Sequence, residues 1–435
     1  MNPIMIYDDV ATLRNIGQAV RDNTMYQNAF MNALVNVISR YFVWSRIFDD
    51  PWATLDKGEL EPGEVIEEIF VDLAKVHSYS PEDAESTWMA REMPNVRAAF
   101  HRINYQKFVK QTIQEDDLSL AFTSWEGVRR LVSEIVQVMY NTARYARKEA
   151  KKYMIAWAIV NGQVAPISHS AVTSQAGAQS ALVAYRKFAL DNRDYCFGYN
   201  NAGVRNYIDP EDLVLIIDND AQSYIDVSQL AMAFNMDKTD FLGRVLPIQG
   251  FDTFDYDILD DIFENDSDYA HFTSAQTNLL ATVSGVAMDR NFLQVWNKKF
   301  EMRTQDNGQG LYRQYWLHDW CVLSLSPFAN AAVFTTSSAS ISGVTVTPST
   351  ATVDPGQSVM LTAAVAGSGI YNHGVTWSYE SDSETGTVQI DGGNLHVGAD
   401  VPGGTEITVT ATSIADSTKY GTATVTVSGG EGGGN

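Results

Sequence analysis

The longest periodic pattern of apolar side chains lies between residues 122 and 160. Apolar residues recur there at steps of three and four positions, which is the spacing of one face of an α-helix. The Asn161-Gly162 pair that follows is a helix stop signal. The pattern predicts one helix over 122–160, roughly 50 Å long at about 1.5 Å per residue, which would serve as a structural spine. Its apolar stripe consists of Phe122, Trp125, Val128, Val132, Ile135, Met139 and Thr142.

Shorter patterns predict the other elements before residue 337. The β-branched run Leu213–Asp218 has the length of a buried strand. A helix capped by Asp226 or Ser228 follows it, and Arg244–Ile248 predicts a second strand, so this stretch forms a small α/β unit. We expect further helices within 1–50, over 80–93 and over 176–190, and further strands over 104–114, 282–288, 300–304 and 311–324.

Residues 51–78 carry a different pattern. The turn signals Asp56-Lys57-Gly58 and Glu61-Pro62-Gly63 lie close together. Beyond them, apolar residues are interleaved with acids from Glu64 to Asp72. We therefore predict that residues 51–78 form an extended loop or hairpin that stands off the body of the protein.

The residue types change around positions 337–343. Aromatic residues and both signs of charge are interspersed before this point, whereas Thr, Val, Ala, Ser and Gly dominate after it. Alternating apolar and polar runs, separated by Gly and Pro, predict an all-β sandwich over 341–428. Trp377 lies within one of these runs, so we expect it in the core of the sandwich. The Gly-rich residues 429–435 predict a flexible tail.

The chain of 435 residues has a net charge of -23 at pH 7. This acidity disfavours a surface that contacts phosphates, because each phosphate contact needs Lys or Arg. Two cysteines are too few for a disulfide framework, and we expect both thiols to be buried. The first residues lack a basic region followed by an apolar run, so we expect no secretory signal. The apolar stretch Phe30–Phe48 contains Arg40 and Arg46, which excludes an ordinary membrane span.

No pattern of residues predicts catalysis. The seven histidines show no close pair at zinc spacing, and no nucleophile elbow, Walker loop or dinucleotide glycine pattern occurs. Eight acids lie between Asp252 and Asp268, but a calcium loop would also need a central Gly. We interpret this segment as a polar surface loop or edge strand. We therefore expect no enzymatic activity, no metal and no cofactor.

The densest basic cluster lies in the second half of the predicted spine helix. Charge runs on helices are usually solvated faces. The other interpretations are a contact with an acidic neighbouring subunit or a weak contact with nucleic acid, and one cluster does not separate them. The cluster consists of Arg144, Arg147, Lys148, Lys151 and Lys152.

Several blocks of the chain together carry a specific resemblance. The blocks are Glu64–Asp72, Arg91–Val96, Gln111–Asp116, Ala121–Trp125, Leu215–Asp218, Ala233–Met236, Thr239–Gly243, Gly310–Tyr312 and Ser326–Ala331. They resemble the major capsid protein of the Picovirinae group of short-tailed phages. The matches are collinear from about Glu64 to Phe334, which makes the resemblance more specific than any single motif would.

This resemblance implies an α+β protein with the Hong Kong 97 fold. The sandwich over 341–428 resembles a group 2 bacterial immunoglobulin-like domain, on runs such as Val344–Pro348 and Ile407–Thr412. The parts implied for the rest of the chain are an N-terminal helical arm over 1–50, an extended loop over 51–78, a peripheral domain with the spine helix over 79–190, and an axial domain with return strands over 191–336.

The resemblance also implies a structural protein that assembles into an icosahedral or elongated head shell around a double-stranded DNA phage genome. The implied triangulation number is above one. The implied partners are copies of the chain in pentamers and hexamers, a scaffolding protein, a portal, weakly bound packaged DNA, and a host surface reached by the immunoglobulin-like domain. We expect the protein in the virion, assembled in the host cytoplasm, without membrane contact.

Two other functions fit parts of the sequence: a bacterial surface adhesin and a cellular nanocompartment shell. The absence of domain repeats disfavours the first, and the appended sandwich disfavours the second. For the shell function, the residues that we predict at subunit interfaces are Glu64, Glu67, Glu68, Phe70, Arg91, Glu92, Arg144, Arg147, Lys148 and Lys151.

Overall fold

The computed structural model describes residues 47–61, 65–77, 94–113, 125–225, 244–264, 266–267, 269–310, 312–383 and 386–429. These residues form two compact units, and three elements contribute to both of them. The three elements are helix α5 (Trp125–Val160) and strands β9 (Leu293–Asn307) and β10 (Tyr312–Leu325). The helices predicted within 1–46, over 80–93 and over 226–234 lie outside the described residues.

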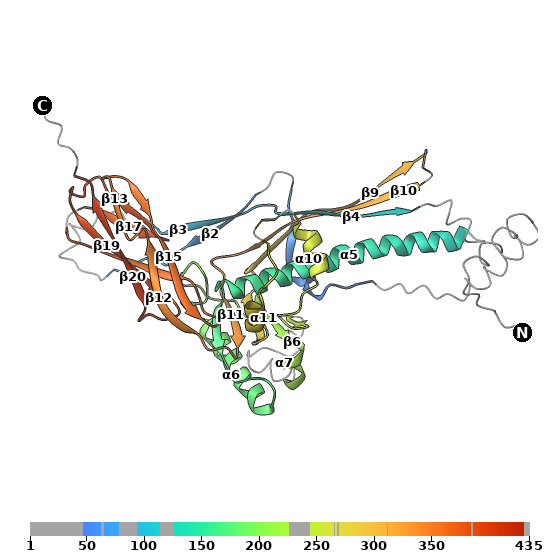
Figure 1. Cartoon of the computed structure of the whole chain (residues 1–435), viewed down its shortest axis with the longest axis horizontal. Helices are drawn as coiled ribbons and strands as arrows, with labels where there is room; N and C mark the ends of the chain where they lie inside the picture. Colours follow the sequence, from blue (N-terminus) through green and yellow to red (C-terminus); the bar gives the residue numbers. More distant parts are fainter. Residues whose placement is uncertain are drawn as a thin grey trace, which may run out of the picture. The chain divides into compact units, whose positions relative to one another are not determined.

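The first unit packs the N-terminal part of α5 against a sheet. Its strands are β4 (Tyr105–Ile113) and the parts of β9 and β10 between residues 299 and 320, in the order β9-β10-β4. Met139 and Ala143 of α5 form one core cluster with Tyr315 and Leu317 of β10. Figure 1 shows α5 as one uninterrupted helix. The predicted strand over 104–114 and the described part of the predicted spine helix are therefore confirmed.

Among the predicted stripe residues whose side chains the structure describes, Thr142 departs from the prediction. Thr142 is exposed, and its hydroxyl donates a hydrogen bond to the Val138 carbonyl at 2.9 Å. The neighbouring Ala143 is buried instead. The prediction placed Thr142 three positions after Met139, whereas a period of 3.6 residues brings Ala143, four positions on, closer to the buried face.

The second unit contains a five-stranded sheet in the order β5-β11-β8-β6-β7. Strand β6 (Leu213–Asp218) runs parallel to β7 (Val245–Ile248), as a strand, helix and strand sequence requires. Helix α6 (Gln175–Asp191) packs on this sheet, with the Tyr185 ring edge-on to Phe334 at 4.3 Å between centroids. The remaining strands of the sheet are β5 (Ala165–Ser168), β8 (Val283–Asp289) and β11 (Ala331–Thr335), and the short helix α7 (Asn219–Tyr224) follows β6.

The middle of the acid-rich segment after Asp252 is a helix, so its interpretation as a loop or edge strand is wrong for residues 256–263. Helix α10 (Tyr256–Phe263) begins at Asp255, whose carboxylate accepts a hydrogen bond from the Ile258 amide at 3.4 Å. Leu259 and Ile262 lie three positions apart and are buried, which leaves the acids on the exposed side. A second helix, α11 (Ser274–Leu280), follows with a complete capping box at Thr273 and Gln276.

Residues 51–59 belong to the body of the second unit, which corrects the start of the predicted extended loop. A 3-10 helix, η1 (Pro51–Leu55), buries Trp52 and Leu55 completely. Strand β1 (Asp56–Glu59) then pairs in parallel with the first residues of β9. The contact with β9 continues past β1, because the Leu60 amide donates a hydrogen bond to the Asn297 carbonyl at 2.7 Å.

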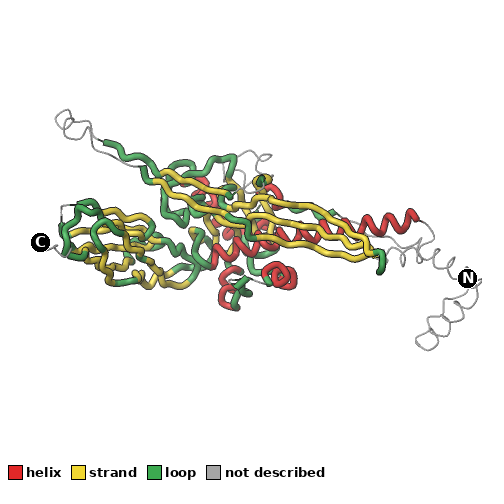
Figure 2. Tube along the Cα trace, turned by 90° about the horizontal axis from the view of Figure 1, so that it is seen from above, coloured by secondary structure: helices red, strands yellow, loops and turns green. Residues whose placement is uncertain are grey.

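Residues 340–427, called the C-terminal domain from here on, form a β structure around their own core. Its described residues consist of strands joined by turns (Figure 2). Trp377 is partly buried and packs against this core, closer to its edge than we predicted. The strands are β12 (Ser340–Thr347), β13 (Thr350–Val353), β14 (Ser358–Met360), β15 (Thr362–Ser368), β16 (Val375–Ser381), β17 (Val388–Asp391), β18 (Asn394–Val397), β19 (Glu406–Ser413) and β20 (Tyr420–Val427).

Candidate functional site

A two-stranded antiparallel ribbon carries three of the described residues that we predicted at interfaces, Glu67, Glu68 and Phe70. It consists of β2 (Ile66–Val71) and β3 (Val96–His101). Ile66 pairs with His101 at one end of the ribbon, and Val71 pairs with Val96 at the other. Because directly paired residues point to the same side of a ribbon, this register sorts the side chains into two faces.

The outer face of the ribbon is exposed and largely apolar. It contains the pairs Val71 with Val96, Ile69 with Ala98, and Glu67 with Phe100. The side chains of Ile69 and Phe100 are 59% and 62% exposed. A contiguous exposed apolar surface is typical of a protein–protein contact. Phe100 was not among the predicted interface residues, although Val96, Ala98 and Phe100 alternate with other residues in the sequence.

The inner face of the ribbon is attached to the second unit by polar contacts and one ring contact. Glu68 accepts a hydrogen bond from the Ser326 hydroxyl at 2.7 Å and lies 3.1 Å from His101 Nε2. His101 Nδ1 lies 2.7 Å from the Ser324 hydroxyl. The Phe70 ring stacks on Phe328 at 5.4 Å between centroids. Each hydrogen bond of this kind contributes about 1 kcal/mol, so the base of the ribbon is held on the body.

The predicted interface residues of the ribbon therefore lie on two different faces. Glu67 lies on the outer face, whereas Glu68 and Phe70 lie on the inner face and contact the same chain. Glu64, Arg91 and Glu92 lie outside the described residues.

The basic cluster of α5 is not a solvated face. Arg147 is buried and forms an ion pair with Asp319 of β10. Lys151 is fully buried, with its ammonium 2.5 Å from Asp56 and 3.0 Å from the Trp52 carbonyl. The charges of Arg147 and Lys151 are thus paired inside the chain, contrary to the interpretation that they face solvent, a neighbour or nucleic acid.

The other three basic residues also make contacts within the chain or lie partly buried. The Arg144 guanidinium donates a hydrogen bond to the Phe48 carbonyl at 3.2 Å. The Lys152 ammonium donates to the Thr253 carbonyl and lies 5.2 Å from the centroid of the Phe254 ring. Burial lowers the pKa of Lys152. Lys148 is half-buried.

A second buried charged group lies at the turn between β8 and β9. Burial raises the pKa of the Asp289 carboxyl to about 6, although the backbone amide of Asn291 donates a hydrogen bond to it at 2.7 Å. The nearby Lys57 ammonium donates to the Asn291 side chain, and burial lowers the pKa of Lys57. These groups join β1 to the turn, and their contacts account for a structural role.

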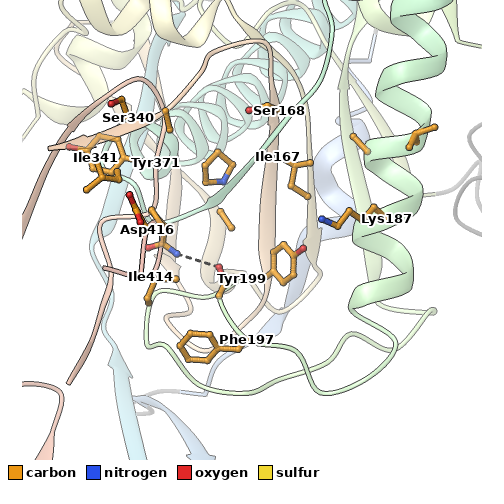
Figure 3. A pocket seen from close by; sticks show the side chains of 18 of the residues that line it. Ile167, Ser168, Lys187, Phe197, Tyr199, Ser340, Ile341, Tyr371, Ile414 and Asp416 are labelled. Carbon is orange, nitrogen blue, oxygen red and sulfur yellow. Dashed lines mark hydrogen bonds between the residues drawn. The ribbon is translucent and has the colours of Figure 1, made fainter. Parts of the chain in front are cut away.

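An open cavity of about 1070 Å³ lies between α6 and the C-terminal domain (Figure 3). Lys187 on α6 and Asp416 of the C-terminal domain come from different walls. Asn372 of the C-terminal domain donates a hydrogen bond to the carbonyl of Gly198, which lies outside that domain, at 3.4 Å. The lining residues include no histidine or cysteine.

The described residues contain no group of three or more His, Cys, Asp or Glu placed to hold a metal ion. Within the same residues, no helix has the length and apolar character needed to cross a membrane. The exposed apolar outer face makes the ribbon the feature of the described chain that best fits a functional site, and its chemistry suits binding.

Comparison with known proteins agrees with this picture. The Phi29-like phage major capsid protein family matches residues 6–335, and the group 2 bacterial Ig-like domain matches residues 340–427. The major capsid protein of Bacillus phage PZA is 34% identical over 403 residues, which cover 91% of this chain and 82% of that protein. The major capsid protein of Bacillus phage B103 is 34% identical over 386 residues, covering 87% and 79%.

A solved structure shows the same fold at much lower identity. A chain in the capsid structure of Staphylococcus phage Andhra is similar with a TM-score of 0.53 and 13% identity. The similarity covers 68% of this chain and 87% of that chain. At this identity the likeness establishes the fold alone.

Proposed function

Since this chain belongs to the Phi29-like phage major capsid protein family, we propose that the outer face of its β2–β3 ribbon binds a second copy of the chain in the head shell. The protein is a structural component of a capsid shell with an appended bacterial immunoglobulin-like domain, as the resemblance implied. This family assignment replaces the alternatives of a bacterial adhesin and a nanocompartment shell. The observation that carries the proposal is the exposed apolar stripe of Ile69, Val71, Val96 and Phe100.

The physical argument starts from what a shell needs. A shell is held by many weak contacts that repeat and sum. Fully burying an Ile, Val or Phe side chain contributes about 1.5–3 kcal/mol, so the outer face supplies a modest contact energy per copy. Two long exposed edges and an apolar face on a narrow ribbon have little stability alone. A neighbouring copy that covers this face would remove the exposed apolar surface.

The finer parts of the function are proposals of the same kind. We propose that copies form pentamers and hexamers, guided by a scaffolding protein and a portal, around packaged double-stranded DNA. Contact with DNA would be weak, because the chain carries a net charge of -23 and the basic residues Arg147 and Lys151 are paired inside it. The C-terminal domain is the part that we propose to reach a host surface.

The experiment substitutes the outer face without disturbing the inner one. Ile69→Ser combined with Phe100→Ser should leave the circular dichroism of the unassembled chain unchanged and abolish shells in negative-stain electron microscopy. Glu67→Gln, which alters a polar residue of the same face, is the matched control and should assemble. Normal shells from the double variant would refute the proposal. Deleting the whole segment from Pro51 would be a poor test, because Trp52 and Leu55 belong to the core.

A further inference from the structure

Arg97 connects three parts of the second unit. It lies on β3, paired with Phe70 of the inner face. Its Nη1 donates a hydrogen bond to the Ala202 carbonyl at 2.8 Å, and its Nη2 lies 3.0 Å from Asp391 Oδ1 at the end of β17. A further carboxylate, Asp72, lies 4.0 Å away. The guanidinium therefore joins the ribbon to the loop around Ala202 and to the C-terminal domain.

The loop around Ala202 also contacts the C-terminal domain directly. Asn372 donates its hydrogen bond to Gly198 in this loop. The Ile414 side chain lies so near the loop that a Cβ built on Gly198 or Gly203 would be 3.6 or 3.5 Å from it. The same loop thus contacts Arg97 on one side and the C-terminal domain on the other.

The loop is fixed to the segment that holds the inner face of the ribbon. The Ala202 amide donates a hydrogen bond to the Pro327 carbonyl at 2.9 Å, and Phe328, the next residue, stacks on Phe70. The ribbon and the C-terminal domain therefore rest on one shared segment of backbone, and Arg97 closes the connection between them.

A second contact fixes the C-terminal domain at the end of α5. The His373 amide donates a hydrogen bond to the Gly162 carbonyl at 2.9 Å. Gly162 has a φ of +64°, and a Cβ on it would lie 2.3 Å from the His373 ring. Only glycine allows this close approach. The neighbouring residues Asn372 and His373 thus attach the C-terminal domain to the loop around Ala202 and to the end of α5.

We propose that the C-terminal domain has a function within its own chain: through Asp391 and Arg97 it holds the β2–β3 ribbon in one orientation before subunits meet. The domain would thereby determine the direction in which Ile69 and Phe100 are presented. This consequence for assembly rests on the proposed function of the outer face, whereas the holding contact itself does not. Asp391 is 52% exposed, so its ion pair with Arg97 is weak. We expect the pair to change the population of the held ribbon orientation by a few-fold and to leave folding intact.

Hydrogen–deuterium exchange of the unassembled full chain tests the holding contact. In Asp391→Asn, amides of 66–71 and 96–101 should exchange a few-fold faster than in the parent, while amides of β6 and β8 should not change. Glu380→Gln, which removes an exposed charge elsewhere in the C-terminal domain, is the control and should behave as the parent. Unchanged ribbon exchange in Asp391→Asn would overturn the proposal.

A second variant separates loss of the pair from damage to the C-terminal domain. Arg97→Gln leaves the sequence of that domain intact and should speed ribbon exchange by a similar factor. The double variant should add little to either single one, because both remove the same interaction. Fully multiplicative effects in the double variant would contradict the proposed pairing.

The proposal for the outer face and the proposal for the Asp391–Arg97 contact can be refuted independently of each other. Normal assembly of Ile69→Ser with Phe100→Ser would refute the role of the outer face and would leave the exchange results standing. Faster ribbon exchange in Asp391→Asn without slower shell formation would refute the consequence for assembly alone.

Discussion

Arg147 of α5 and Asp319 of β10 form a buried ion pair inside the first unit. Arg147 Nε lies 3.3 Å from Asp319 Oδ2, while Nη2 contacts Oδ1, so the guanidinium meets the carboxylate with two of its nitrogens. The two residues are 172 positions apart in the sequence. Two-point contacts of this kind are directional as well as strong, and this one fixes the helix on the sheet.

Removing one partner of this pair should be costly. Asp319→Ala leaves a buried guanidinium without its counter-charge, which typically destabilises a protein by about 3–5 kcal/mol. Urea unfolding of the unassembled chain should show the loss as a lower transition midpoint. Glu301→Gln, at an ion pair that faces solvent, should leave the midpoint in place. Equal midpoints for Asp319→Ala and the parent would contradict the importance of the pair.

Asp289 should make stability depend on pH. Its folded-state pKa of about 6 lies above the ordinary value of 3.8, so its contribution is complete below about pH 4 and is lost as the pH rises through 6. The loss is roughly 3 kcal/mol at 1.36 kcal/mol per pKa unit. Asp289→Asn should therefore match the parent near pH 4 and exceed it in urea unfolding at pH 7.5.

The control for this prediction is Glu211→Gln, which changes an exposed acid and should follow the parent at both pH values. A parent that is no less stable than Asp289→Asn at pH 7.5 would show that Asp289 does not carry the predicted penalty.

Cys196 should react slowly in the folded chain. Burial, followed by the charge of Asp191, raises the pKa of its thiol to about 11 from an ordinary 9.0. The hydrogen bond that Asn330 donates to its sulfur at 3.3 Å opposes this rise in pKa but does not outweigh it. Because the thiolate is the reactive form, alkylation by iodoacetamide at pH 8 should be about 100-fold slower than in the urea-unfolded chain. Peptide mass spectrometry distinguishes it from Cys321, and equal rates in both states would contradict the prediction.

Two adjacent glycines in the turn between β17 and β18 should differ in their tolerance of alanine. Both have positive φ, 55° at Gly392 and 89° at Gly393. A Cβ on Gly393 would lie 2.3 Å from the Leu361 carbonyl oxygen and 3.0 Å from Trp377, whereas nothing lies within 4 Å of one on Gly392. Gly392→Ala should cost about 1 kcal/mol from backbone strain alone.

Gly393→Ala adds a clash to the same strain, so it should cost clearly more than Gly392→Ala. Calorimetry of the full chain would compare the two variants with the parent. If Gly392→Ala were the more damaging of the two, the packing of Trp377 over this turn would be wrong.

Local periodicity accounts for what was predicted well. The described part of α5, the buried strand Leu213–Asp218 and the C-terminal sandwich all have apolar spacings that depend only on neighbouring residues. The acids around α10 hid this signal, because Leu259 and Ile262 are only two apolar positions within a strongly charged segment. The apolar outer face of the ribbon was not predicted for a related reason. The alternating residues of β3 form this face only together with those of β2, with which β3 is paired.

Periodicity, turn residues and collinear blocks are all written along the chain, so they were enough to predict several main helices and strands, the C-terminal sandwich and the resemblance to a capsid protein family. Which charged side chains pair inside the chain became visible only in the folded structure. Arg147 and Lys151 look like surface residues in the sequence, yet Asp319 and Asp56 pair with them. Burial and pairing depend on segments distant in sequence that meet in space, so no local pattern can reveal them.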